Sequence, residues 1–177
     1  MALIEKRYAK AFFDLAVQNN AIDEYQEELV MITKILQNDT SFESFLFTPK
    51  NDILKKKHLL TDVFKGRVNK NTLNFLLLLL DKDRIKFLPA ICKEFIVMSD
   101  EFKSILNISI FTATDLTKKD INDICNSFKK LYNAKSVKAE VEIDKTLIGG
   151  IKVAVGDKVY DGTIKGKLSG LQSVLTK

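Results

Sequence analysis

The sequence is poor in the residues that build cross-links, metal sites and catalytic centres. Its 177 residues include one histidine and two cysteines, Cys92 and Cys125. Each cysteine falls at an apolar position of a helical pattern, so we expect free thiols rather than a disulfide. One histidine and two separated cysteines do not supply the ligands of a zinc site. His58 follows three lysines without an accompanying nucleophile or orienting carboxylate, so we expect it to be structural.

Long hydrophobic segments are also missing. The longest apolar run, Phe75–Leu80, has six residues, whereas a membrane-spanning helix needs about 20. The first residues lack the apolar stretch of a secretory signal, and Glu5 and Asp14 disfavour a transit peptide. We therefore expect no direct insertion into a membrane.

Glycine is scarce, and no phosphate-binding loop is present. Gly162–Lys167 comes nearest, but it has one residue too few between its glycines, and Leu168 stands where that motif needs Ser or Thr. Gly149-Gly150 and Gly156 lie between predicted strands, where turns account for them. We expect no cofactor and no catalytic residues.

The formal charge of +5 raises the possibility of a nucleic-acid partner. Basic and acidic residues nearly balance up to residue 105, and most of the excess follows it. Lys55–Lys57 is the only dense basic cluster before that point, and no aromatic residue is interleaved with it. We expect no nucleic acid to bind. An RNA-binding helical protein is nevertheless the rival hypothesis, and an enzyme comes third.

What the sequence does contain is helical periodicity from residue 3 to about residue 104. Asn69 is placed to cap a helix, Gly66 to end one, Pro49 to break the chain and Pro89 to sit in a first turn. The pattern predicts a six-helix bundle over residues 1–104, with helices near 4–17, 22–36, 42–46, 52–65, 69–80 and 85–102.

Around residue 105 the apolar period changes from 3.6 to 2. Strands are predicted near 106–110, 137–143, 151–155 and 159–160, and Thr117 is placed to cap a helix after the first of them. Thr163 is placed to open a closing helix. The predicted fold class is therefore mainly α with a small α+β part, the second domain spanning residues 105–177.

The first and fifth helices carry more apolar surface than a bundle core requires. If they pack side by side, a shallow groove between them would be lined by Tyr8, Ala11, Leu15, Asn74, Leu77, Leu78 and Asp81. Ala11 would keep this groove open for an incoming helix. The alternative is that all these residues belong to the core. The leucine stripe of the final helix has the same two interpretations, a docking face or packing on the sheet.

At this point the sequence resembles the delta subunit of F-type ATP synthases over essentially its whole length. The resemblance rests on Tyr8-Ala9-Lys10-Ala11, on Arg84–Pro89 and most specifically on Ile148–Val153 and Asp161–Leu168. One departure is Asp83, which stands where the family commonly has glycine, so we expect a different turn there. The resemblance implies a non-catalytic subunit of the peripheral stalk, the stator of a complex that couples hydrogen ion transport to ATP synthesis.

The resemblance also implies the partners. The groove residues would hold the N-terminal helix of an alpha subunit of the catalytic head. Lys165, Lys167, Leu168 and Leu171 would face the C-terminal ends of the b subunits. The protein would be a single copy in a hetero-oligomer, peripheral on the cytoplasmic side of a bacterial inner membrane.

Overall fold

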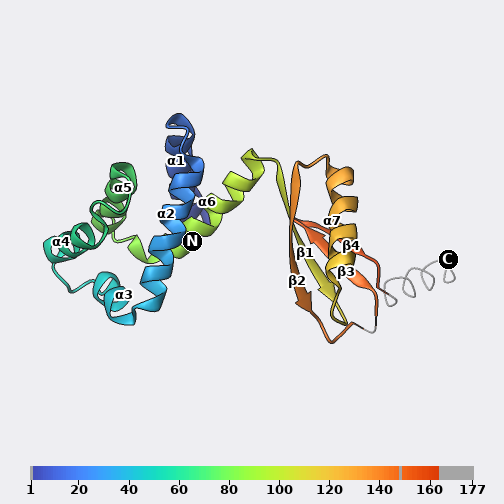
Figure 1. Ribbon diagram of the computed structural model, residues 1–177. Helices are drawn as coiled ribbons and strands as arrows, with labels where there is room; N and C mark the ends of the chain where they lie inside the picture. Colours follow the sequence, from blue (N-terminus) through green and yellow to red (C-terminus); the bar gives the residue numbers. More distant parts are fainter. Residues whose placement is uncertain (1, 148, 164–177) are drawn as a thin grey trace. The chain divides into compact units, whose positions relative to one another are not determined.

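The helical spacing of the first hundred residues produces six α-helices, as predicted. The computed structural model describes residues 2–147 and 149–163 (Figure 1). A 3-10 turn, η1 (Ile85–Phe87), precedes the last helix of the six. The helices are α1 (Ala2–Gln18), α2 (Ile22–Asn38), α3 (Thr40–Phe47), α4 (Ile53–Phe64), α5 (Lys70–Asp81) and α6 (Leu88–Phe102).

Most helix ends follow local chemistry. Asn69 caps α5, its side chain accepting a hydrogen bond from the amide of Asn71. Gly66 follows the end of α4 with φ +79°, a conformation that glycine adopts without strain. Pro89 lies in the first turn of α6, where no amide hydrogen bond is lost. These signals are short-range, which is why the sequence predicted them.

The prediction of a different turn at Asp83 is wrong, because aspartate forms there the turn that a glycine would form. Asp83 has φ +52°, in the left-handed region that glycine enters freely and aspartate tolerates. Its amide donates to the carbonyl of Leu80, and the amide of Arg84 donates to that of Leu79. These two bonds form a Schellman motif, so α5 ends as a helix with a C-terminal glycine does.

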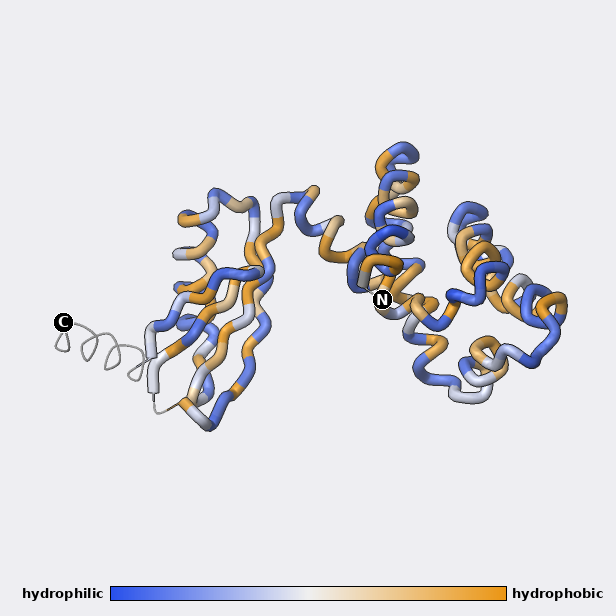
Figure 2. Tube along the Cα trace, turned by 180° about the vertical axis from the view of Figure 1, so that it is seen from behind, coloured by the Kyte–Doolittle hydropathy of each residue, from blue (hydrophilic) through white to orange (hydrophobic). Residues whose placement is uncertain are grey.

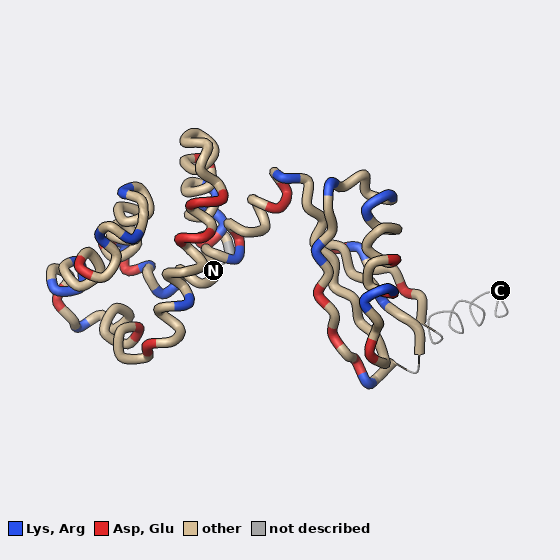
Figure 3. The backbone as a smooth tube through the Cα atoms, in the orientation of Figure 1, with Lys and Arg blue, Asp and Glu red and all other residues tan. Residues whose placement is uncertain are grey.

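Stacked aromatic rings form the centre of the bundle core. Phe12 stacks on Phe75 with ring centroids 4.3 Å apart and on Tyr25 at 5.2 Å, and it contacts Phe95 at 5.6 Å. Phe12, Tyr25 and Phe95 are each at most 2% exposed. Burying such rings contributes about 2 kcal/mol each. Figure 2 shows hydrophobic residues recurring along each helix, and Figure 3 shows charges of both signs between them.

A four-stranded mixed sheet follows, with the order β2-β1-β3-β4. Strand β1 pairs with β2 in parallel and with β3 antiparallel, and β3 pairs antiparallel with β4. A parallel pair needs a long crossover, which α7 supplies. The elements are β1 (Ile105–Thr112), α7 (Lys118–Tyr132), β2 (Ser136–Ile143), β3 (Ile151–Val155) and β4 (Lys158–Asp161).

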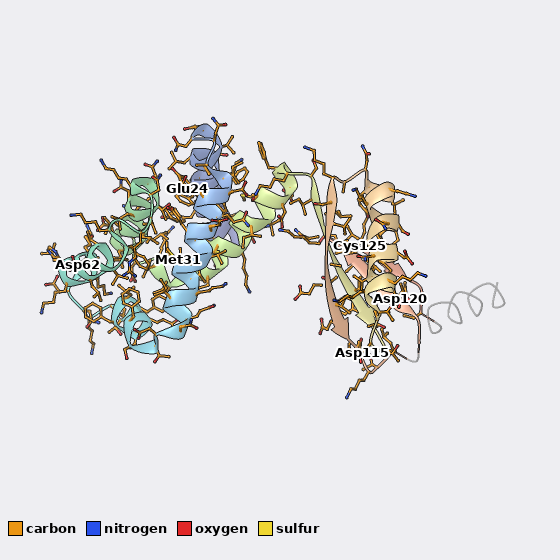
Figure 4. All side chains as sticks on the ribbon, viewed as in Figure 1. Glu24, Met31, Asp62, Asp115, Asp120 and Cys125 are labelled. Atoms are coloured by element: carbon orange, nitrogen blue, oxygen red, sulfur yellow. The ribbon has the colours of Figure 1, made fainter. Side chains whose placement is uncertain are left out.

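Helix α7 covers one face of this sheet. Ile108, Ile110, Val153 and Val155 form the buried centre, and Cys125 packs against it from α7 (Figure 4). Their alternation along β1 and β3 confirms the period-2 pattern. The predicted closing helix after Thr163 lies outside the described residues.

The described residues divide into two units between Ser99 and Asp100. Asp100 is 2% exposed, and its carboxylate accepts hydrogen bonds from Lys138 Nζ (2.6 Å) and Asn107 Nδ2 (2.9 Å). These two hydrogen bonds connect Asp100 to β1 and β2 within the second unit. The domain boundary predicted at residues 104 and 105 stays a prediction.

Candidate protein-binding groove

Helices α1 and α5 lie against each other in opposite directions. At one end, Arg84 donates a hydrogen bond to the Tyr8 hydroxyl (3.3 Å) and lies over the Tyr8 ring. At the other end, the side-chain amides of Asn19 and Asn71 both donate to the Tyr25 hydroxyl, at 3.1 Å and 2.8 Å. Polar contacts therefore fix both ends of the helix pair.

Between these ends the surface is hollowed into a groove with a cavity volume of about 260 Å³. Its floor is the Phe12–Phe75 stack. Ala11 is exposed at its rim, and Leu78 is 45% exposed although it is a large apolar side chain. The lining residues are Ala11, Phe12 and Leu15 from α1, and Asn71, Asn74, Phe75 and Leu78 from α5.

Four of the seven predicted groove residues line this groove, namely Ala11, Leu15, Asn74 and Leu78. The other three lie elsewhere. Tyr8 packs with Arg84 at the end of the helix pair, Leu77 is half-buried, and Asp81 forms an ion pair with Lys57 (2.6 Å).

The sequence reasoning missed three lining residues. Phe12 and Phe75 were not named among the groove residues, yet both line the groove although they are only 2% and 8% exposed. Asn71 was missed because a polar residue at a helix start gives no apolar signal. The contact of Asn71 with Tyr25 joins residues 46 positions apart, and no local pattern reveals such a contact.

Two other hollows in the described residues are larger than the groove. One, of about 530 Å³, is lined by α2 alone, including Val30, Met31 and Ile35. The other, of about 450 Å³, lies on the sheet and is lined partly by charged residues such as Lys138 and Glu140. We favour the α1–α5 groove as a helix-binding site because two helices form its walls and aromatic rings its floor.

The predicted residues Lys165, Lys167, Leu168 and Leu171 lie outside the described part of the chain. They stay candidates for contact with the b subunits.

Cys92 and Cys125 are free thiols, and burial raises the pKa of Cys92 against an opposing hydrogen bond with Thr33. No three His, Cys, Asp or Glu side chains among the described residues are grouped to hold a metal ion. Within the same residues, every helix is too short or too polar to cross a membrane.

Comparison with known proteins decides the family. The sequence profile of the ATP synthase delta (OSCP) subunit matches residues 4–175. The chain belongs to this family. It is 41% identical to the ATP synthase subunit delta of Acetivibrio thermocellus, covering 99% of this chain and 98% of the relative. It is 38% identical to that of Ruminiclostridium cellulolyticum, covering 99% of both chains.

A solved structure has the same fold. A chain in the cryo-EM structure of the Toxoplasma gondii mitochondrial ATP synthase hexamer aligns with a TM-score of 0.76. The alignment covers 98% of this chain and 97% of the other at 19% identity. Family membership confirms the function that the sequence resemblance implied: a non-catalytic component of the peripheral stalk of the ATP synthase, the complex of ATP synthesis and proton transport.

Proposed function

We propose that the α1–α5 groove binds the N-terminal helix of an alpha subunit of the catalytic head. The second unit joins the C-terminal ends of the b subunits. The protein then acts as a single copy on the cytoplasmic side of a bacterial inner membrane. The observation that carries this proposal is a groove with an aromatic floor, an alanine rim and an exposed leucine, between two antiparallel helices.

The groove suits an amphipathic helix for physical reasons. Its exposed apolar surface gains about 25 cal/mol per Å² when a partner covers it, before the costs of association. Ala11 leaves room for the backbone of the partner to approach α1. Asn71 and Asn74 on the opposite wall supply amides that can pair with polar groups beside the partner's apolar stripe.

The mechanical role follows from two binding sites on one chain. Rotor torque would turn the catalytic head unless a static linkage resisted it. A subunit that holds the head through its bundle and the stalk through its second unit provides that resistance without any catalytic residue.

Substitution of Ala11 by tryptophan tests the groove assignment. The indole would occupy the groove and block the incoming helix, so we expect Ala11→Trp to weaken binding to the catalytic head at least about a hundredfold. Lys10→Trp is the matched control, because Lys10 is exposed on the same helix and does not line the groove. Isothermal titration measures both affinities, and circular dichroism checks the fold. Wild-type affinity in a folded Ala11→Trp variant would remove the groove assignment.

A further inference from the structure

The N-terminus of α5 has an unusual cap. In α7 the cap is local: Thr117 accepts from the amide of Asp120, and the Asp120 carboxylate accepts from the amide of Thr117. In α5, Asn69 caps the helix, but the third helical residue is Thr72, which provides no carboxylate to accept from the Asn69 amide. That amide must find its acceptor elsewhere.

Glu28 of α2 supplies this acceptor from 41 residues away. Its Oε1 accepts a hydrogen bond from the Asn69 amide at 2.5 Å, and its Oε2 accepts one from the Thr72 hydroxyl. Thr72 is fully buried, so this hydroxyl has no access to bulk water. Glu28 thus accepts a hydrogen bond from the N-cap amide of α5, as Asp120 does from the N-cap amide of α7.

A second glutamate adds negative charge at the same helix start. Glu24, in the first turn of α2 (Figure 4), accepts a hydrogen bond from the Asn69 side chain at 3.3 Å. Carboxylates are favourable at a helix N-terminus because the unpaired amides there carry partial positive charge. The capping contacts therefore hold α5 to α2 in one register.

This cap lies in the turn of α5 that forms one end of the groove wall. Asn71 stands between the two residues that Glu28 contacts, and it both lines the groove and bonds to Tyr25, one turn before Glu28 on α2. Asn74 and Phe75 of the same wall follow within one turn. A shift of this turn would move the groove wall relative to Ala11 and Leu15.

We infer that Glu28 is a positioning residue for partner binding: it fixes the N-terminal turn of α5 from outside the groove and so sets the position of the groove wall. The inference rests on the proposed function of the groove. Glu28 itself does not line the groove. It acts through Asn69 and Thr72, and its loss changes the groove without removing any atom that contacts the partner.

The test compares Glu28→Leu, Glu28→Gln and the control Glu27→Leu in the full chain. Glu27 is an exposed neighbour on α2. Glu28→Leu removes both acceptors, so we expect about tenfold weaker head binding through faster dissociation, in line with usual couplings between sites. Glu28→Gln restores binding, because its carbonyl accepts from the Asn69 amide and its NH2 group donates to the Thr72 hydroxyl. Glu27→Leu binds like the wild type.

Hydrogen exchange supplies a readout of the free protein. Glu28→Leu should accelerate exchange at the amides of Asn69–Leu73 while other helices stay protected. If Glu28→Leu does not fold, Thr72→Val is measured instead, since it removes one of the two contacts with little change of shape. Wild-type affinity and protection in Glu28→Leu, or in the substitute Thr72→Val, overturns the inference.

The two proposals fail in different ways. If Ala11→Trp binds the head normally, the groove assignment fails, while the exchange data still report whether Glu28 holds α5. If Ala11→Trp abolishes binding and a folded Glu28→Leu binds like the wild type, only the positioning role fails.

Discussion

Two glycines of the segments that carry the family resemblance, Gly150 and Gly162, lie next to each other. A Cβ atom at Gly150 would lie 2.6 Å from the carbonyl oxygen of Gly162, closer than any normal contact, and Gly150 has φ +86°. The amide of Gly162 donates to the carbonyl of Ile151 at 2.9 Å. The backbone before β3 therefore packs on the backbone that follows β4, which leaves no room for a side chain at Gly150.

We predict that Gly150→Ala destabilises the second unit more than Gly156→Ala does. Gly156 is the matched control because it has φ +55° and nothing within 4 Å of an added Cβ. Left-handed strain costs each variant about 1–2 kcal/mol, and overpacking adds at least about 1 kcal/mol at Gly150. Urea denaturation measures the difference in the free energy of unfolding, and hydrogen exchange at β3 assigns that difference to the second unit. If both variants lose the same free energy of unfolding, the backbone around Gly150 shifts at no cost to accommodate the added Cβ atom, and the prediction is wrong.

At the scale of elements, the capping box of α7 makes the start of this helix sensitive to acid. Hydrogen bonds from the Thr117 hydroxyl and amide hold the pKa of Asp120 below its usual value. A carboxylate with a lowered folded pKa stabilises the fold above its unfolded pKa of about 3.9, and this contribution is lost as the pH falls through the folded value.

We therefore predict that the first turn of α7 loses protection as the pH falls below about 4. Hydrogen exchange at Lys118–Ile121 in the full chain measures this loss. Asp120→Asn is the control, because its side-chain oxygen still accepts hydrogen bonds but does not titrate in this range. An identical pH dependence in the wild type and in Asp120→Asn would mean that another group causes the loss.

The elements that the sequence predicted are those set by neighbouring residues. Asn69, Gly66 and Thr117 specify helix ends within a few positions, and alternation along β1 and β3 specifies their buried face. The strand order and the parallel pairing of β1 with β2 depend on contacts between distant residues. No local pattern encodes them, so the sequence predicted strands without their arrangement.

The groove likewise combines features set by neighbouring residues with features set by distant contacts. Apolar surplus on α1 and α5 suggested a groove or additional core, and Ala11, Leu15, Asn74 and Leu78 from the predicted set do line a cavity. That this cavity binds a partner stays a prediction. The roles of Tyr8 and Asp81 depend on Arg84 and Lys57, which reach them from other elements. The role of Glu28 could not be predicted, because the sequence around a glutamate on a polar helix face is the same whether or not that glutamate caps a distant helix.

At the scale of the whole molecule, one small chain contains two compact units, and the proposed function gives each of them a different partner. The bundle offers an apolar groove, and the second unit carries most of the excess positive charge of the sequence. Apolar helix-in-groove binding is only weakly sensitive to salt, whereas binding that depends on clustered lysines falls steeply as salt increases. The salt dependence of binding therefore separates binding through the apolar groove from binding through clustered lysines.

The most direct test is a titration of the purified chain against a catalytic head that has been stripped of its own delta subunit. The measurement is made at low and at moderate salt, and circular dichroism verifies that the chain is folded. We predict tight one-to-one binding that changes little between the two conditions. Absence of binding by the folded chain, or affinity that collapses at moderate salt, would contradict the proposal that the groove holds the head.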